Sequence, residues 1–335
     1  MTSPALRALK ESFSGVKLTL LTSEMGASIA RFIPEVDQTL VFTAPWIKSE
    51  KESSNLDLLN LLPKIKKRQF DLSIIFTNFS QNPLPAAMIA YLTGIPRRLS
   101  YCRENPHKLL TDWYPDPEPF SGVTHGVKRQ LKLVEAIGAK TKNPNLSLKV
   151  PKIGVYRAIK KLEEAGADLY KPWMIVHPGS SEPKRRFPVE LFAKSTKLIT
   201  NRLGIQVVIT GIEQEGKLAD IILQQNPSAF SLVGQLDLSE LIGLLSVSPL
   251  LLSNNTGPVH IAAAVNTPVV VLYARTNPEH TPWMVKNEIL FFDYPQKLKS
   301  KNEILKYTFP KECIPAPTPE EICKACKRML AEDSI

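Results

Sequence analysis

The sequence lacks the features that mark secreted, membrane-spanning or disulfide-stabilised proteins. Four cysteines in 335 residues are too few for a disulfide framework and are typical of a reducing compartment. The N-terminal segment has no apolar stretch of the signal-peptide kind. The longest apolar stretch, residues 261–274, is interrupted by Asn266, Thr267 and Pro268 and is too short to cross a bilayer. The sequence therefore predicts a cytoplasmic protein that could touch a membrane only at its surface.

The motifs of several enzyme and binding classes are also missing. There is no D-x-D for a divalent metal, no G-x-G-x-x-G, no H-x-x-x-H zinc pair and no G-x-S-x-G of serine hydrolases. The lone C-x-x-C, Cys323 to Cys326, lacks a second ligand pair apart from Cys313, so zinc or redox use is the minority interpretation. A net charge of +10 favours anionic partners. We expect no nucleic acid among them, because the cations form no stripe interleaved with aromatic residues.

Apolar segments of strand length alternate with amphipathic segments of helix length along the whole chain. This alternation is typical of parallel sheets with right-handed crossovers. A break in composition between Lys140 and Pro151 predicts two domains, residues 1–150 and 151–335, and the last helix could pack back on the first domain. We therefore expect an α/β fold of two Rossmann-like doubly wound domains facing a cleft, with ligands at the carboxyl ends of the strands. Residues 101–122, rich in proline, are expected to form a surface loop.

The loop S-N-N-T-G-P-V-H, residues 253–260, follows an apolar strand and precedes a helix. Asn255 or Thr256 can cap the helix and Pro258 fits its first turn. Free backbone N–H groups and the positive end of the helix dipole would then favour a pyrophosphate, which Gly257 lets approach closely and His260 can reach. A capped helix with a half-buried histidine and no ligand is the alternative.

A second loop, H-P-G-S-S-E-P-K-R-R-F-P at residues 177–188, also lies between a strand and a helix. Ser180 and its neighbours offer neutral donors, and Lys184 and Arg185 can neutralise a phosphate. A solvated basic loop is the alternative. The third loop, from Thr210 to Leu218, nearly matches a P-loop, but Leu218 replaces the hydroxyl that binds magnesium. Its carboxylates suit ribose hydroxyls better than phosphate.

Together these loops resemble the heptosyltransferases of glycosyltransferase family 9, which transfer heptose from ADP-heptose to the inner core of lipopolysaccharide. The resemblance is most specific from Val176 to Trp283, through the P-G-S…K-R-R-F-P, T-G-x-E-x-E, G-Q-L-D-L-S-E-L and S-N-N-T-G-P-V-H motifs and Thr276-Asn277-Pro278. Weaker matches in the first domain are T-S-P-A-L-R-A-L-K-E, F-D-L-S-I-I-F and L-T-G-I-P-R-R.

The resemblance implies a GT-B type enzyme whose C-terminal domain binds the nucleotide sugar and whose N-terminal domain binds the acceptor. It implies no cofactor and no metal, an anionic glycolipid as acceptor, and peripheral contact with the inner membrane at most. Arg103, His107 and Lys108 are candidates to meet the acceptor's anionic groups. The donor-binding residues that it implies, together with those read from the loops, are Ser180, Lys184, Arg185, Glu215, Leu236, Asn255, Thr256, Gly257 and His260.

Within this set, Thr256 and Gly257 would hold the diphosphate, with His260 nearby, and Glu215 would bind the ribose. Leu236 would lie beside the adenine. Arg185 would occupy the position of a family lysine on the phosphate, with Lys184 as the alternative.

Two departures from the family pattern bear on activity. Asn255 stands where the family usually has aspartate, which removes a charge near the donor. The family also begins with a strand and a glycine-rich loop that carries the aspartate thought to be the catalytic base, and both are absent ahead of Met1-Thr2-Ser3-Pro4. By the resemblance this is one central strand and one loop, roughly 20 residues. We therefore leave the catalytic residue unassigned and keep two hypotheses, an active transferase with an upstream start or an inactive nucleotide-sugar-binding remnant.

Overall fold

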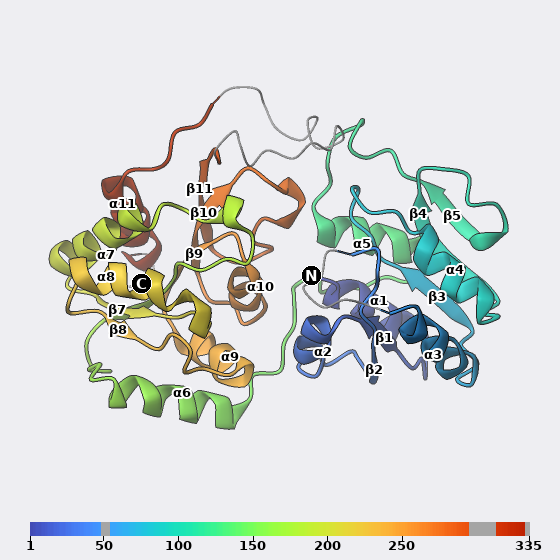
Figure 1. Cartoon of the computed structure of the whole chain (residues 1–335), viewed down its shortest axis with the longest axis horizontal. Coiled ribbons are helices and arrows are strands. Elements are labelled where there is room, and N and C mark those ends of the chain that lie inside the picture. The colour runs from blue at the N-terminus through green and yellow to red at the C-terminus, as the bar shows by residue number, and fades with distance from the viewer. Residues whose placement is uncertain (48–53, 295–312, 332–335) are drawn as a thin grey trace. The chain divides into compact units, whose positions relative to one another are not determined.

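A computed structural model describes residues 1–47, 54–294 and 313–331, which form two compact units (Figure 1). The first unit is Met1–Pro144, and the described residues from Asn145 onward form the second. The sequence places this boundary at residue 150. Every paired strand in both units runs parallel to its neighbour. The predicted α/β fold with parallel sheets is therefore confirmed. Among the described residues, no helix is long and apolar enough to cross a membrane.

The second unit contains one six-stranded sheet in the order β8-β7-β6-β9-β10-β11. Its strands are β6 (Trp173–His177), β7 (Gln206–Ile209), β8 (Phe230–Ser231), β9 (Leu251–Asn254), β10 (Val269–Ala274) and β11 (Asn287–Phe292). Its α-helices are α6 (Lys152–Glu164), α7 (Val189–Leu203), α8 (Gly216–Gln225), α9 (Leu238–Val247), α10 (Gly257–Ala264) and α11 (Pro319–Ala331). The strand order reverses between β6 and β9, and ligands of doubly wound sheets bind beside such a switch point.

The central strands β6 and β10 are apolar over nearly their whole length, without alternation, because helices cover both faces of the sheet. All residues of β6, β9 and β10 are buried, as expected for parallel strands in the middle of an α/β unit. Local signals set the ends of the helices around them. Asp237 caps α9 and forms a capping box with Glu240, and Gly204 ends α7 in the left-handed conformation with φ of 66°.

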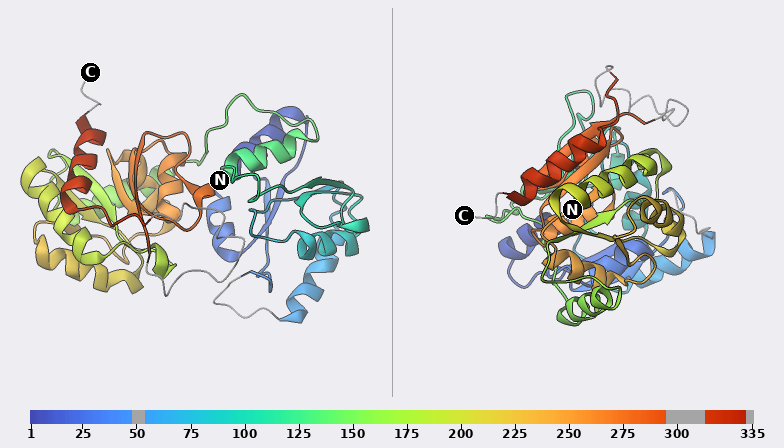
Figure 2. Two further views of the ribbon diagram at one scale, coloured as in Figure 1. Left: turned by 90° about the horizontal axis from the view of Figure 1, so that it is seen from above. Right: turned by 90° about the vertical axis from the view of Figure 1, so that its left-hand side faces the viewer.

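The last helix, α11, lies along α7 in the second unit (Figure 2). Its buried face, which includes Ile322, Cys326 and Met329, joins the apolar cluster formed by α7 and the sheet. The apolar stripe of this helix is therefore buried within the second unit. The expectation that the helix also packs back on the first domain stays a prediction. The two cysteines of the C-x-x-C motif are buried in that stripe, and burial raises the pKa of both thiols.

Helices α6 and α9 cross at two glycines, which lets their backbones approach closely. A Cβ atom added to Gly154 would lie 2.3 Å from the carbonyl oxygen of Ser239, and one added to Gly243 would lie 2.4 Å from the amide nitrogen of Val155. No side chain fits at either position without a shift of the backbone.

The first unit carries its strands in two sheets, β1-β2 and β3-β4-β5. The strands are β1 (Thr19–Thr22), β2 (Gln38–Val41), β3 (Leu72–Ile75), β4 (Arg97–Cys102) and β5 (Asp112–Pro115). The helices are α1 (Ser3–Ser12), α2 (Glu24–Ala30), α3 (Asn55–Lys66), α4 (Leu84–Leu92) and α5 (Gly126–Glu135). The prediction of a surface loop over residues 101–122 is wrong for β5, which pairs with β4. This short edge strand tolerates Pro115 because its outer edge needs no hydrogen bond.

Candidate functional site

The loops that follow β6 and β9 meet at the switch point of the second unit, where the buried side chain of Asn254 connects them. Its Nδ2 donates to the carbonyl oxygen of Pro178 at 2.6 Å, and its Oδ1 accepts from the backbone N–H of Phe187 at 3.0 Å. Asn254 thereby holds the loop of residues 177–188, called the basic loop below, beside the end of β9. The sequence analysis did not assign Asn254, and its position as the last residue of an apolar strand was the available signal.

Helix α10 begins beside this junction with an open N-terminus. Thr256 is its N-cap residue, but its side chain makes no capping hydrogen bond, so the expected capping by Thr256 is wrong. A Cβ atom added to Gly257 would meet no atom within 4 Å, so nothing packs against the first turn at that position. His260 follows one turn later, half-buried, with its ring centroid 6.2 Å from that of His280. The positive end of the helix dipole lies at this first turn.

Asn255 is 1% exposed and holds the loop after β9 against the loop after β10. Its Nδ2 donates to Oδ1 of Asn277 at 2.8 Å, and the hydroxyl of Tyr273 donates to the carbonyl oxygen of Asn277 at 2.5 Å. Asn255 thus contributes to the shape of the site from within the protein. Its predicted contact with the donor stays a prediction.

The basic loop contains a short 3-10 helix, η2 (Pro183–Arg185), that lies against β10. Arg186 donates from Nε to the carbonyl oxygen of Ser180 at 2.7 Å. Arg185 differs, because its Nε is buried and has no hydrogen-bond partner among the described residues. Burial and the charge of Glu279 raise the pKa of Tyr273, while the positive charge of Arg185 acts in the opposite direction. Arg185 therefore lies within electrostatic range of Tyr273 and of the asparagines that Tyr273 contacts.

Glu215 places the loop after β7 against Gly179 in the loop after β6. It lies in η3 (Glu213–Glu215), and its Oε2 accepts the backbone N–H of Ile212 at 3.0 Å. A Cβ on Gly179 would lie 2.0 Å from Oε1 of Glu215, so the glycine leaves the room that the carboxylate occupies. Glu215 and Ser180 are therefore neighbours through Gly179. Leu236 lies half-buried in the turn after β8, where Gly234 donates to the carbonyl oxygen of Gly211 at 3.0 Å.

His177 is a further buried polar residue at the ends of β6 and β7. Its Nδ1 lies 3.0 Å from the hydroxyl of Thr210. Burial lowers the pKa of His177 to about 4, so the ring is neutral near pH 7. Its contact joins two of the strand ends that carry the loops of the site.

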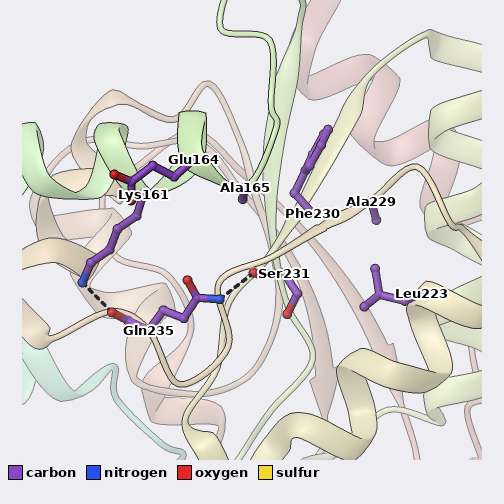
Figure 3. Close-up of a pocket in the computed structure, with 8 residues that line it drawn as sticks. All are labelled: Lys161, Glu164, Ala165, Leu223, Ala229, Phe230, Ser231 and Gln235. Atoms are coloured by element: carbon purple, nitrogen blue, oxygen red, sulfur yellow. Dashed lines mark hydrogen bonds between the residues drawn. The ribbon is translucent and has the colours of Figure 1, made fainter.

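A cavity of about 400 Å³ lies elsewhere in the second unit (Figure 3). It is lined by Lys161, Glu164, Ala165, Leu223, Ala229, Phe230, Ser231 and Gln235. None of the predicted donor-binding residues lines it. Its one lysine donates to both carboxylate oxygens of Glu240 at 2.8 and 2.7 Å, so the charge is already neutralised. In the described part of the chain, no group of three or more His, Cys, Asp or Glu side chains could hold a metal ion.

Three residues of the first unit, Arg103, His107 and Lys108, are expected to meet an acceptor, and one of them has a structural role. Arg103 donates to the carbonyl oxygens of Phe79 and Glu118 at 2.8 and 2.7 Å. His107 and Lys108 are exposed in the short helix η1 (His107–Leu109). Their exposed side chains are accessible to an anionic molecule.

A buried ion pair holds the remainder of that loop. Arg129 on α5 donates to both carboxylate oxygens of Asp116 at 2.8 Å and to the carbonyl oxygen of Thr77 at 3.0 Å. Its guanidinium also lies 4.5 Å from the ring centroid of Tyr101. Because a buried bidentate pair of this kind is costly to break, residues 112–118 are held against the carboxyl ends of β3 and β4.

The chain shares sequence with curated heptosyltransferases, among them the following two. Lipooligosaccharide heptosyltransferase 2 of Haemophilus influenzae is 27% identical over 233 residues, which cover 66% of this chain and 65% of the relative. The chain thus spans just under two thirds of that protein. Lipopolysaccharide heptosyltransferase 3 of Escherichia coli K12 is 24% identical over an alignment that covers all of this chain and 95% of the relative.

Solved structures share the fold over nearly the whole chain. A family 9 glycosyltransferase from Veillonella parvula has a TM-score of 0.78 at 17% identity, covering 99% of this chain and 93% of that one. The E. coli heptosyltransferase WaaC, solved with ADP-2-deoxy-2-fluoro heptose, has a TM-score of 0.65 at 15% identity, covering 99% and 95%. The neighbours are of the GT-B type, as predicted. The model of glycosyltransferase family 9 (heptosyltransferase) matches residues 58–307, so the resemblance seen in the sequence is confirmed and the chain belongs to this family.

Proposed function

We propose that the chain transfers heptose from ADP-heptose to a lipopolysaccharide core or a related glycolipid, without a metal. Membership of family 9 and the names of the relatives support this reaction. The single observation that supports the donor half is that Asn254 joins the loop after β6 to the loop after β9. These loops carry the unpartnered Nε of Arg185 and the N-terminus of α10 at Gly257, which we propose to act on the same ligand.

The chemistry of these two groups suits a diphosphate. The N–H groups of the first turn and the helix dipole attract an anion, and a guanidinium adds charge-assisted hydrogen bonds. Both act more strongly as negative charge develops on the leaving ADP, so they would lower the barrier to transfer. Lys184, one residue away, would add to the positive potential.

The other predicted residues would orient the nucleotide. Glu215 has one oxygen on the N–H of Ile212, which leaves the other as an acceptor for a ribose hydroxyl. Leu236 would pack against the adenine, and Ser180 would offer its hydroxyl to a phosphate. Asn255 would hold the loop in place, and His260 would reach the same ligand from the next turn of α10.

We infer the acceptor from the exposed polar residues of the first unit and from the membership of the chain in family 9. A glycolipid with anionic groups would meet the exposed side chains of His107 and Lys108 in the first unit. Such an acceptor is presented at a membrane surface. The proposal therefore includes a cytoplasmic enzyme with peripheral contact at the inner membrane.

The test compares Gly257→Ala with Gly216→Ala. Both glycines begin a helix of the second unit, and an added Cβ meets nothing within 4 Å at either position. Both variants should therefore fold. The methyl group at position 257 would occupy the space proposed for the phosphate, so we expect the Kd for ADP to rise about 10- to 100-fold, or roughly 1.4–2.8 kcal/mol. Gly216→Ala should bind ADP like the parent.

Calorimetry with ADP, UDP and GDP and transfer from ADP-heptose to a heptose-deficient lipopolysaccharide core would measure these effects, with and without EDTA. Transfer that persists in EDTA and is lost in Gly257→Ala supports the proposal. ADP binding without transfer by the parent would instead favour a nucleotide-sugar-binding protein. Failure to bind any of the three nucleotides would refute the donor site.

A further inference from the structure

Helix α4 is apolar on all sides, although one side of it lies at the surface of the first unit. From Leu84 to Pro96 the sequence contains no charged residue. Within this segment, the side chains of Met88, Tyr91 and Leu92 are exposed. A helix at the surface of a protein normally carries polar residues on its outer face, and a helix that is hydrophobic all round is normally buried. The outer face of α4 is therefore of the kind that another apolar surface covers.

Helix α3 presents a second exposed apolar stripe. Its residues Leu61 and Ile65 are buried in the core. Leu56, Leu59 and Pro63 are exposed, and their spacing of three and four residues places them on one face of the helix. Helix α3 is thus apolar on the side that packs inward and again along part of its outer side.

The two helices cover the same side of the first unit (Figure 2). Leu61 of α3 and Ile89 of α4 belong to one apolar cluster. Ile74 of β3 joins the cluster of α1, whereas Ile75, on the other face of the strand, joins the cluster of Ala87 in α4. The exposed apolar residues of α3 and α4 therefore lie on one outer surface, called the α3–α4 surface below. Its large side chains are 42–61% exposed and are those of Leu56, Leu59, Met88, Tyr91 and Leu92.

Positive charge borders the α3–α4 surface at the end of α3. The last turn of this helix and the residues after it carry exposed cations, which are Lys64, Lys66, Lys67 and Arg68. Within the described part of the chain, the three lysines form no ion pair. The acidic residue of α3, Asp57, lies in the first turn and accepts the backbone N–H of Ser54 at 2.9 Å. The lysines are therefore not neutralised by their own helix.

We propose that the α3–α4 surface binds a lipid bilayer that contains anionic lipids. The apolar side chains of an interfacial helix enter the boundary between headgroups and acyl chains, and lysines beside them are attracted to anionic headgroups. Tyr91 suits this boundary because its ring is apolar and its hydroxyl is polar. A second copy of the chain on the same surface would bring two sets of lysines together, whereas an anionic bilayer neutralises them. The inference deepens the proposed function and rests on its membrane contact, to which it gives a surface.

The test measures binding of the full chain to vesicles of phosphatidylcholine and phosphatidylglycerol in about a 2:1 ratio, and to vesicles of phosphatidylcholine alone. Leu59→Glu is compared with Ile153→Glu. Ile153 lies on α6 of the second unit and is 56% exposed, and Leu59 is 57% exposed. Urea unfolding of each variant checks that it is folded.

A second comparison tests the charge. One variant replaces Lys64, Lys66 and Lys67 by glutamine. Its control replaces three exposed cations of α6 by glutamine and therefore has the same net charge; these are Lys152, Arg157 and Lys160.

We expect Leu59→Glu to weaken binding to the anionic vesicles at least about tenfold, because it places a charge in the apolar boundary. Loss of the three lysines should also weaken binding at least about tenfold, since each contributes roughly a fivefold effect. Both α6 controls should bind like the parent to within about threefold, and the parent should bind phosphatidylcholine alone more weakly than the anionic vesicles.

Parent protein that does not bind the anionic vesicles, or equal losses in the α3 variants and their α6 controls, would overturn the proposal. A parent dimer in sedimentation that Leu59→Glu dissociates would show that a second copy covers the surface, and would also overturn it. Calorimetry with ADP on the same proteins separates this inference from the donor site. Vesicle binding without ADP binding refutes the donor site alone, and ADP binding without vesicle binding refutes the α3–α4 surface alone.

Discussion

Replacing Arg185 with alanine should separate stability from nucleotide binding. In the parent, the guanidinium Nε is buried without a hydrogen-bond partner among the described residues, a state that costs about 1–3 kcal/mol. Removing the side chain relieves this cost but also loses packing of its half-buried stem, at about 0.8 kcal/mol per buried CH₂. These effects oppose each other, so we expect the free energy of unfolding to stay within about 1 kcal/mol of the parent.

The effect on ADP should be much larger. Hydrogen bonds to a charged group contribute about 1.5–3 kcal/mol, which corresponds to an increase in Kd of roughly 10- to 150-fold. At an ADP concentration of 100 times the parent Kd, the ligand stabilises the parent by about 2.7 kcal/mol. If the Kd rises 100-fold, the same ADP concentration stabilises the variant by only about 0.4 kcal/mol.

Thermal unfolding with and without ADP measures the free energy of unfolding, and calorimetry on the same samples measures the Kd for ADP. Arg202→Ala is the matched control, because Arg202 is exposed at the end of α7, away from the loops of the site. A variant at position 185 that binds ADP as tightly as the parent would refute the assignment of this arginine. A loss of more than about 2 kcal/mol of stability without ligand would show instead that the guanidinium supports the fold.

Two further predictions concern the second unit. Gly154→Ala should lower the free energy of unfolding by about 1–3 kcal/mol in urea, because its Cβ would lie 2.3 Å from the carbonyl oxygen of Ser239; unchanged stability would contradict the close helix contact. Burial lowers the pKa of His177 to about 4, so the unfolded chain binds more protons than the folded one between pH 6.5 and 4. Stability should therefore fall by up to about 3 kcal/mol as the pH drops through this window. His177→Asn should remove that part of the pH dependence. If the free energy of unfolding changes with pH by the same slope in the parent and the variant, titration of His177 is not its cause.

Some elements escaped prediction because their sequence signals are weak. The strand β8 has two residues and β5 has four, of which Trp113 and Tyr114 are exposed. Such short edge strands show no clear periodicity. The capping of α10 was also misjudged, because the sequence offers Thr256 as a cap but does not reveal that its side chain makes no capping bond.

The sequence by itself determined the periodic elements and the residue types of the loops that follow β6, β7 and β9. Burial of β6 and β10 followed from their apolar runs, since a strand covered on both faces needs apolar side chains in both directions. These patterns are local. They can therefore be recognised without knowing which strand lies next to which.

Only the tertiary structure decided which loops meet. Asn254 contacts Pro178 and Phe187, which are 76 and 67 positions away in the sequence, and these contacts exist because β9 pairs with β6. The fit of Glu215 over Gly179 and the packing of α11 on α7 depend likewise on strand order and helix placement. Strand order is set by the sum of many long-range contacts, and no local segment of the sequence encodes that sum.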